Sequence, residues 1–352
     1  LRKSGKLVVG GSVYTDKLEE DREFGQSEMK RLGMLTLPSW NFDDYDKALE
    51  FIKNNPGRYV YKPSGFIPSD WRGFLFMGKE EDGKDLYEVL SQNKKVISKK
   101  IKQFQLQKFV SGVEVGMSAF FNGNDFVTPI LIAFEHKRLF PGELGPMTGE
   151  MGTSMFWSEP NKLFKETTGR MLEDLRRSKY VGYIDINCIV NGRGIYPLEF
   201  TCRFGYPTIS IQQEGVLSEW GELLYSMAKG ETFDLKTKKG FQIGVVCVTP
   251  PFPYDDPSEF ELYKDLSILF KKPNIEGVHI GDIKTVDNIW RVAGSSGYVL
   301  IVTGHGTTME EARKQAYSRL DNIILLNNIY RTDIGVTWGE DSDKLQTWGY
   351  LY

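Results

Sequence analysis

Residues 183–205 read YIDINCIVNGRGIYPLEFTCRFG. Two runs rich in β-branched and aromatic residues, 183–190 and 195–200, flank Asn191-Gly192. An Asn-Gly step between two such runs is typical of a β-hairpin. We expect Asp185 and Glu199, one on each predicted strand, to share a Mg²⁺ ion, and Arg203 to hold a carboxylate or phosphate. A plain hairpin with two surface acids is the alternative.

Helical and β-rich patterns alternate on both sides of this hairpin, which predicts an α/β protein. Before it, β-rich runs at 59–62, 74–77, 104–110, 115–121 and 126–134 are interleaved with helical patterns at 16–32, 43–54, 84–93 and 163–179. After it come a helix over 217–229, strands at 244–248, 278–283 and 298–303, and a helix that begins at Thr307 or Thr308. Residues 139–160 are rich in Gly, Pro and Met, which predicts a long loop. A basic linker, 236–239, places a domain boundary near residue 238.

Composition narrows the class of protein. A chain of 352 residues is long enough for two or three domains, and its net charge of −3 favours neither nucleic acid nor an acidic membrane as a partner. No apolar run approaches the ~20 residues of a membrane span. Three cysteines without CxxC spacing favour a reducing, cytoplasmic compartment, and three scattered histidines exclude a His-built zinc site. Because the chain begins Leu1-Arg2-Lys3, without Met or a signal-peptide core, we expect a fragment or a cleaved product.

Two further segments suit a nucleotide. Lys62 ends a predicted strand and is followed by Ser64-Gly65. The lysine could bind phosphate oxygens through its positive charge, and the small residues would let backbone N–H groups approach those oxygens. The extended run 107–110 precedes Gly112-Val113-Glu114, which offers backbone groups to an adenine and a carboxylate to a ribose. The alternatives are a surface lysine before a turn and an ordinary hairpin.

A third segment gathers cations beside glycines. His136, Lys137 and Arg138 precede the glycine-rich run 142–152, which suits an anionic substrate or a phosphate. A solvated charged loop is the alternative. Each segment alone is a weak signal, and their order along the chain carries more information.

In that order the motifs resemble glycinamide ribonucleotide synthetase (phosphoribosylamine–glycine ligase), an ATP-grasp family, over residues 18–335. The shared motifs are Lys62 to Gly65, Gly112-x-Glu114, His136-Lys137-Arg138, Gly145-Pro146-x-Thr148-Gly149-x-Met151-Gly152, Glu199-Phe200-x-x-Arg203-Phe204-Gly205-x-Pro207, and Tyr330-Arg331-Thr332-Asp333-Ile334-Gly335.

The resemblance implies an ATP-grasp fold of two α+β lobes, with nucleotide between them, and a small C-terminal α/β domain. Residues 1–20 would be the remnant of a mostly absent N-terminal domain, 21–238 the ATP-grasp module with a small lobe at about 57–110, and 239–352 the C-terminal domain. The implied activity is ATP-dependent ligation of an amino-acid carboxylate to a phosphorylated amine, through an acyl phosphate and with Mg²⁺ or Mn²⁺.

Site residues follow from the matched motifs. The resemblance implies that nucleotide is held by Lys62, Ser64, Gly65, Gln107, Lys108, Val110 and Glu114; that metal is held by Glu199 and Thr201; and that Arg203, His136 and Lys137 orient the acyl phosphate and the anionic substrate. Asp185, on the predicted strand beside Glu199, is the third expected metal ligand.

Several positions depart from the family pattern. Glu-x-Asn of the metal site reads Glu199-Phe200-Thr201, and the substrate run carries Met147 for Asn and Glu150 for Gly. A hydroxyl is a weaker ligand than an amide oxygen for a hard cation. Two alternatives therefore stay open, a nucleotide-binding homologue without catalysis and a ligase for another amine or amino acid.

Overall fold

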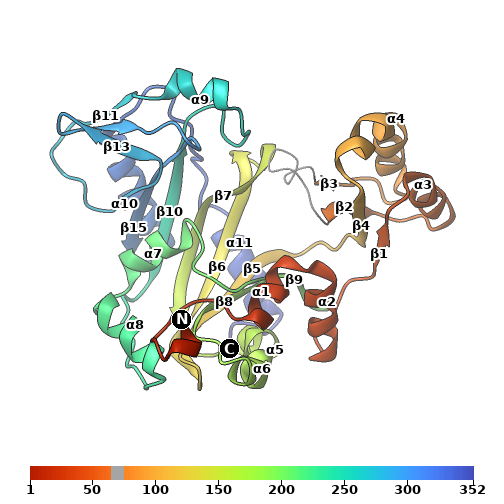
Figure 1. Cartoon of the computed structure of the whole chain (residues 1–352), viewed down its shortest axis with the longest axis horizontal. Helices are drawn as coiled ribbons and strands as arrows, with labels where there is room; N and C mark the ends of the chain where they lie inside the picture. Colours follow the sequence, from red (N-terminus) through yellow and green to blue (C-terminus); the bar gives the residue numbers. More distant parts are fainter. Residues whose placement is uncertain (65–74) are drawn as a thin grey trace. The chain divides into compact units, whose positions relative to one another are not determined.

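The computed structural model describes residues 1–64 and 75–352, apart from the side chain of Lys3 (Figure 1). Its described residues form two compact units. Unit 1 comprises Leu1–Leu35 and Gly112–Tyr352, and unit 2 comprises Thr36–Ser111. Each unit has a hydrophobic core of its own.

Unit 2 is a four-stranded antiparallel sheet with two helices. Its strands lie in the order β1-β4-β2-β3. The elements are β1 (Ser39–Phe42), α3 (Tyr45–Asn54), β2 (Tyr59–Ser64), β3 (Phe76–Met77), α4 (Lys84–Lys100) and β4 (Gln103–Lys108). Helix α3 begins where the sequence predicts, because the Asp44 carboxylate accepts hydrogen bonds from the backbone N–H groups of Asp46 and Lys47. Phe104 and Tyr61 lie at the centre of the core, and both are fully buried.

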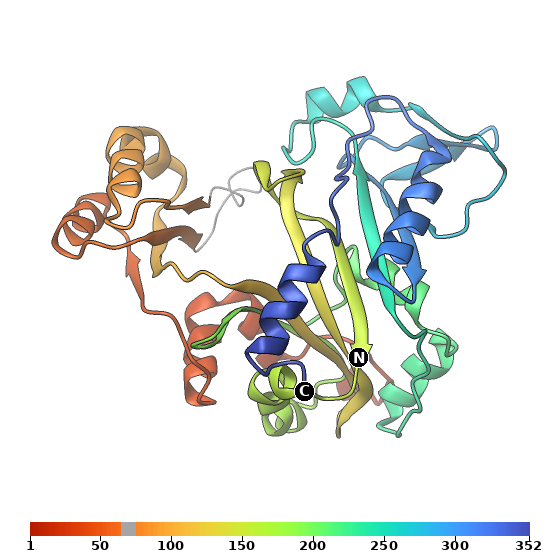
Figure 2. The ribbon, with the colours of Figure 1, turned by 180° about the vertical axis from the view of Figure 1, so that it is seen from behind.

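Unit 1 is built on an eight-stranded antiparallel sheet in the order β12-β15-β10-β7-β6-β5-β8-β9 (Figures 1 and 2). The strands are β5 (Val113–Phe121), β6 (Phe126–Phe140), β7 (Leu144–Ser158), β8 (Gly182–Asn191), β9 (Gly194–Thr201), β10 (Phe241–Val248), β12 (Val278–Ile280) and β15 (Tyr298–Gly306). Successive side chains of a strand point to opposite faces of a sheet. The two faces of this sheet therefore carry different sets of side chains.

One face of the β5-β6-β8 region is apolar. Met117, Ile132, Ile184 and Ile186 are fully buried there in the largest core. The covering elements include α1 (Val13–Glu20), α2 (Arg22–Arg31), α5 (Lys162–Glu166), the 3₁₀ turn Thr168–Met171, α6 (Leu172–Arg177) and α11 (Trp338–Thr347). The opposite face carries the polar residues described below.

The β10-β15 end of the sheet is covered by α7 (Thr208–Gly215) and α10 (Met309–Asp321). The Thr308 side chain accepts from the N–H of Glu311, and the Glu311 carboxylate accepts from the N–H of Thr308, a reciprocal cap at the predicted start of α10. Further elements are the short 3₁₀ helix η1 (Arg2–Ser4), α8 (Trp220–Lys229) and α9 (Pro257–Tyr263). A second sheet of this unit has the strand order β13 (Ile283–Val286), β14 (Ile289–Val292), β11 (Ser267–Phe270) and β16 (Ile323–Ile324).

Among the described residues, none of the helices has the length and apolar character of a membrane span.

Most predicted elements are confirmed, and several differ in extent or in pairing. The helix expected over 16–32 is divided at Asp21, whose side chain caps α2. The helix expected over 163–179 is divided into α5, a 3₁₀ turn and α6. Helix α8 starts at Trp220, and α7 was not predicted from the sequence. Strands β4 and β5 do not pair as a hairpin, because they belong to different sheets.

The predicted long loop over 139–160 is wrong, because most of it is strand β7. Glycine and methionine give this segment little β propensity, but β7 pairs with β6 on one side and with β10 on the other. Backbone hydrogen bonds to two neighbours and burial on both faces outweigh the weak local preference.

The predicted boundary near residue 238 falls inside unit 1, where β10 extends the same sheet as β5 to β9. The limits of the domains stay a prediction.

Candidate active site

The polar face of the large sheet gathers several carboxylates around one lysine. Lys137 of β6 places its Nζ 2.8 Å from Glu114 Oε1, 3.4 Å from Glu135 Oε2 and 3.6 Å from Glu199 Oε1. Strand alternation accounts for this meeting, because Glu135 and Lys137 are two residues apart on β6 and point to the same face. We call these four residues, with Asp185, Asn187 and Glu150, the Lys137 cluster.

Strands β8 and β9 complete the cluster. Asp185 lies opposite Thr201 and Asn187 lies opposite Glu199, so all four occupy the same face of this predicted hairpin. Asn187 Nδ2 donates a hydrogen bond of 2.8 Å to Glu114 Oε1. The sequence prediction that Asp185 and Glu199 stand on neighbouring strands is confirmed, and their role as metal ligands stays a prediction.

Burial and mutual repulsion perturb the acids of the cluster. Burial raises the pKa of Glu135, with added repulsion from Glu114 and Glu199 and partial relief from Lys137. Burial, followed by repulsion from Glu135, raises the pKa of Asp185 and of Glu150 well above the usual carboxyl range. Strongly shifted carboxyl groups gathered on one face are typical of functional sites.

The surrounding carboxylates stabilise the charged form of Lys137. Burial alone would lower the pKa of Lys137, but attraction to Glu135, Glu114 and Glu199 outweighs it and raises that pKa well above its usual value. Lys137 is therefore a permanent cation at neutral pH. Its ammonium group compensates only part of the negative charge that the surrounding carboxylates can carry.

The cluster fits a divalent metal ion by the chemistry of its donors. Carboxylate and amide oxygens are the ligands that Mg²⁺ prefers, and Asn187 Oδ1 and Glu150 Oε1 are buried without a hydrogen-bond partner among the described residues. Gly116, opposite Asn187 on β5, leaves room for the Asp185 carboxylate, because a Cβ there would lie 2.9 Å from Asp185 Oδ1. Within residues 1–64 and 75–352, no three Asp, Glu, His or Cys side chains come close enough together to hold a metal by themselves.

Two predicted catalytic residues lie outside the Lys137 cluster. His136 points to the other face of β6, where its Nε2 accepts from the N–H of Gly335 at 3.5 Å and its Nδ1 lies 3.6 Å from Glu143. Arg203 donates from Nε to Glu19 of α1 at 2.8 Å. The contribution of these two residues to catalysis stays a prediction.

The predicted nucleotide residues of unit 2 lie on two paired strands. Lys62 Nζ donates to Gln107 Oε1 at 2.7 Å, and both side chains are buried. The Lys108 ammonium lies 4.9 Å from the centre of the Tyr59 ring. Ser64 ends β2, and Val110 follows β4 and is partly buried. Gly65, the remaining predicted nucleotide ligand of this segment, lies outside the described residues.

Three members of the Lys137 cluster are not among the site residues predicted from the sequence, namely Glu135, Glu150 and Asn187. The signal for two of them was present, because Glu135 stands two residues before Lys137 and Asn187 two residues after Asp185 on otherwise apolar strands. Glu150 gave no such signal, because its segment did not resemble a strand.

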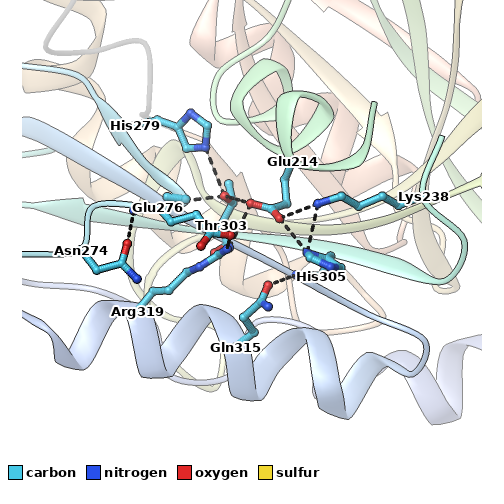
Figure 3. A network of polar contacts seen from close by, with 10 residues as sticks. Glu214, Lys238, Asn274, Glu276, His279, Thr303, His305, Gln315 and Arg319 are labelled. Atoms are coloured by element: carbon cyan, nitrogen blue, oxygen red, sulfur yellow. Dashed lines mark hydrogen bonds and ion pairs between the residues drawn. The ribbon is translucent and has the colours of Figure 1, made fainter. Parts of the chain in front are cut away.

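A second polar network lies at the β15 end of the sheet (Figure 3). The Glu214 carboxylate, at the end of α7, accepts from Lys238 at 3.1 Å, Thr303 at 2.9 Å and Arg319 at 2.9 Å, and lies 2.7 Å from His305 Nδ1. Burial alone would raise the pKa of Glu214, but attraction to Arg319 and these hydrogen bonds lower it to about 2. Every oxygen of Glu214 is satisfied, so this network stabilises the fold and offers no vacant ligand position.

Solved structures show which fold this is. A phosphoribosylamine–glycine ligase from Thermotoga maritima superposes with a TM-score of 0.70 at 23% identity, over 93% of this chain and 81% of that one. The biotin carboxylase domain of the 2-oxoglutarate carboxylase from Hydrogenobacter thermophilus, solved with MgADP, superposes with a TM-score of 0.64 at 12% identity, over 99% and 76%. The mixed α/β architecture is therefore that of the ATP-grasp fold, as the sequence predicts.

Sequence relatives give the family within this class. The model of the phosphoribosylglycinamide synthetase ATP-grasp (A) domain matches residues 20–209, more than half of the chain. A phosphoribosylamine–glycine ligase of Listeria monocytogenes is 24% identical over 95% of this chain and 80% of that protein. A chloroplastic phosphoribosylamine–glycine ligase of Arabidopsis thaliana is 26% identical over 95% and 64%. The chain belongs to the phosphoribosylglycinamide synthetase ATP-grasp family.

Proposed function

We propose that the protein is an ATP-dependent carboxylate–amine ligase that uses ATP with Mg²⁺ or Mn²⁺ and joins an amino acid to a phosphorylated amine. The substrate pair proposed first is glycine and phosphoribosylamine, by analogy with the relatives named above. The main observation in support of this proposal is the Lys137 cluster, in which a lysine lies among carboxylates on one face of the sheet.

The proposed reaction has two steps. A carboxylate oxygen of the amino acid attacks the γ-phosphorus of ATP, an acyl phosphate forms and ADP leaves. The amine nitrogen then attacks the acyl carbon, phosphate leaves, and the nitrogen loses a proton to give the amide. Positioning accounts for much of the rate, because an amine attacks an acyl phosphate readily once both are held together.

Individual residues have separate proposed roles. Glu199 and Asp185 hold the metal ion, which neutralises negative charge on the phosphates when bound. Lys137 fixes the carboxylates in place and supplies a positive charge beside them. Lys62 and Gln107, joined by a hydrogen bond in unit 2, serve as nucleotide ligands. A cytoplasmic location is proposed because Cys188, Cys202 and Cys247 are all buried free thiols.

The test is phosphate release from Mg-ATP with glycine plus phosphoribosylamine, and then with other carboxylates and amines. Glu199→Gln is expected to lower kcat by at least about a hundredfold, the scale seen when a charge-stabilising group is removed. The matched control is Glu261→Gln, which changes an exposed acid that pairs with Lys264. Equal activity of the two variants would contradict the role given to Glu199.

A second candidate is a nucleotide-binding homologue without catalysis. It is favoured by Thr201, which replaces an amide ligand, and by the occupation of the cluster by the Lys137 ammonium. ATP binding without phosphate release from any substrate pair would support it. A third candidate, a ligase for another amine or amino acid, is motivated by Met147 and Glu150, and release with a different pair would support that one.

A further inference from the structure

The metal site of this chain lacks the amide ligand that its family pattern places two residues after the glutamate. Thr201 stands at that position, and across the strand pair it lies opposite Asp185. Glu199 lies opposite Asn187 instead. Directly opposed residues on one sheet face have Cβ atoms about 4.5–5.5 Å apart, close enough for two side chains to bind one ion.

The orientation of the Asn187 amide is fixed by its partner. Its Nδ2 lies 2.8 Å from Glu114 Oε1, which itself lies 2.8 Å from Lys137 Nζ. An ionised carboxylate can only accept a hydrogen bond, so the NH₂ group faces Glu114 and the carbonyl oxygen is the remaining polar atom.

That carbonyl oxygen is buried and unsatisfied. Asn187 is 3% exposed, and its Oδ1 has no hydrogen-bond partner among the described residues. Leaving a buried acceptor unpaired costs about 1–3 kcal/mol. A cation bound at this oxygen would remove that cost, and the excess of carboxylates over Lys137 would favour a divalent ion there.

A neutral oxygen is also the donor that the cluster needs. Among the described segments, no three acidic, histidine or cysteine side chains form a group that could hold a metal ion, so carboxylates alone do not complete a metal site. The amide oxygen of Asn187 is a hard donor on the same face as Glu199 and Asp185.

We propose that the Asn187 amide oxygen is a ligand of the divalent cation held by Glu199, and that it replaces the amide that Thr201 cannot provide. This inference rests on the proposed function, because it assigns a ligand within the metal site of that function. It predicts that the amide ligand has moved from position 201 of β9 to the residue of β8 that faces Glu199.

The experiment measures Mn²⁺ binding by electron paramagnetic resonance, in the presence of a non-hydrolysable ATP analogue. Asn187→Leu removes the oxygen at similar size and is expected to raise the Kd for Mn²⁺ roughly tenfold or more. Asn93→Leu, the same change at an exposed residue of α4, is expected to leave the Kd unchanged. Adding Thr201→Asn to Asn187→Leu is expected to restore most of the affinity.

Circular dichroism establishes that each variant is folded, and Asn187→Asp, which keeps an oxygen donor, replaces Asn187→Leu if that variant does not fold. The Asp variant is expected to bind Mn²⁺ while losing the hydrogen bond to Glu114. Wild-type affinity in Asn187→Leu, or a loss in Thr201→Val alone, would overturn the inference and leave the proposed function intact. No Mn²⁺ binding and no phosphate release by the wild-type protein would overturn the proposed function itself.

Discussion

At the scale of single residues, the Lys137 cluster keeps acids in a setting that opposes their charge. Glu150 is the extreme case, because it is 8% exposed and its Oε1 has no hydrogen-bond partner among the described residues. An ionised carboxylate in such a position is costly, so the folded state favours the protonated form.

The pH dependence of stability follows from this shift. The pKa of Glu150 is raised, by burial and then by repulsion from Glu135, above its ordinary value of 4.5. Between 4.5 and the raised pKa the folded state binds more protons, so the contribution of Glu150 to stability falls as the pH rises. We expect Glu150→Gln to weaken the decrease in unfolding free energy with rising pH. At pH 8 the variant should have a higher melting temperature, by about 2–4 °C for each kcal/mol gained in unfolding free energy.

Thermal unfolding measured from pH 5 to pH 8 checks this expectation. Glu159→Gln, which changes an exposed acid just after β7, serves as the control. Parallel pH profiles for the wild-type protein and Glu150→Gln would show that Glu150 is not the group responsible.

At the scale of elements, two groups of polar contacts join strands of the large sheet to other segments of unit 1. One is the Arg331 side chain, which is 1% exposed and binds Asp333 at 2.8 and 2.7 Å, Glu143 at 2.7 Å and the carbonyl of Arg138 at 3.1 Å. Glu143 belongs to the turn between β6 and β7, so this arginine ties the tip of that hairpin to the C-terminal segment.

Arg331→Lys is expected to loosen the hairpin tip, because a lysine cannot form the paired hydrogen bonds to Asp333 and still reach Glu143. The expected loss of stability is about 1–3 kcal/mol. Hydrogen exchange should rise first over residues 138–149. Arg193→Lys, in the exposed turn between β8 and β9, is the matched control. A rise spread evenly over unit 1 would contradict a local role.

The other contact is the Glu214 network of Figure 3, which joins α7 to β15 and α10. The pKa of Glu214 is about 2 in the folded protein, below its ordinary value of 4.5, so its stabilising effect is complete above pH 4.5 and is lost as the pH falls towards 2. Glu214→Gln is expected to cost about 1–3 kcal/mol at neutral pH, because it leaves the partly buried cations of Arg319 and Lys238 without their partner.

Urea unfolding at pH 7 and at pH 3 measures both effects. The difference between the wild-type protein and Glu214→Gln should shrink at the lower pH. Glu222→Gln, at an exposed position of α8, is expected to match the wild-type protein at both values. A difference that is independent of pH would show that the charge of Glu214 is not what stabilises the network.

At the scale of the whole molecule, the two units have separate hydrophobic cores. Phe104 and Tyr61 belong to the core of unit 2, and Leu300 and Val302 to a core of unit 1. Because each core consists of residues from one unit only, damage to one core should be felt mainly within that unit.

Reciprocal truncations test this separation. Phe104→Ala should cost about 3–5 kcal/mol and Leu300→Ala about 2–5 kcal/mol, through lost burial and the cavity left behind. Hydrogen exchange should rise over residues 36–64 and 75–111 in the first variant, and within 112–352 in the second. Equal increases in both units from either change would show one cooperative structure.

Signals between residues close together in the sequence predict many elements of this fold. The β8-β9 hairpin follows from Asn191-Gly192 between two β-rich runs, and the starts of α3 and α10 follow from Asp44 and Thr308 as caps. The order of motifs predicted the ATP-grasp family and selected Glu114, Lys137 and Glu199, and the hairpin pattern added Asp185; the fold brings these four residues to one sheet face. These signals survive because each depends on residues close together in the sequence.

The remaining features depend on pairing between distant segments, which leaves little local trace in the sequence. Strand β7 exists because β6 and β10 hydrogen-bond to it, although its own sequence resembles a loop. The same pairing separates His136 from Lys137, adjacent in sequence, onto opposite faces of β6, and it adds Asn187 to the face of Glu199. Which side chains share a face depends on strand register, and register is set by the partner strands as much as by the strand itself.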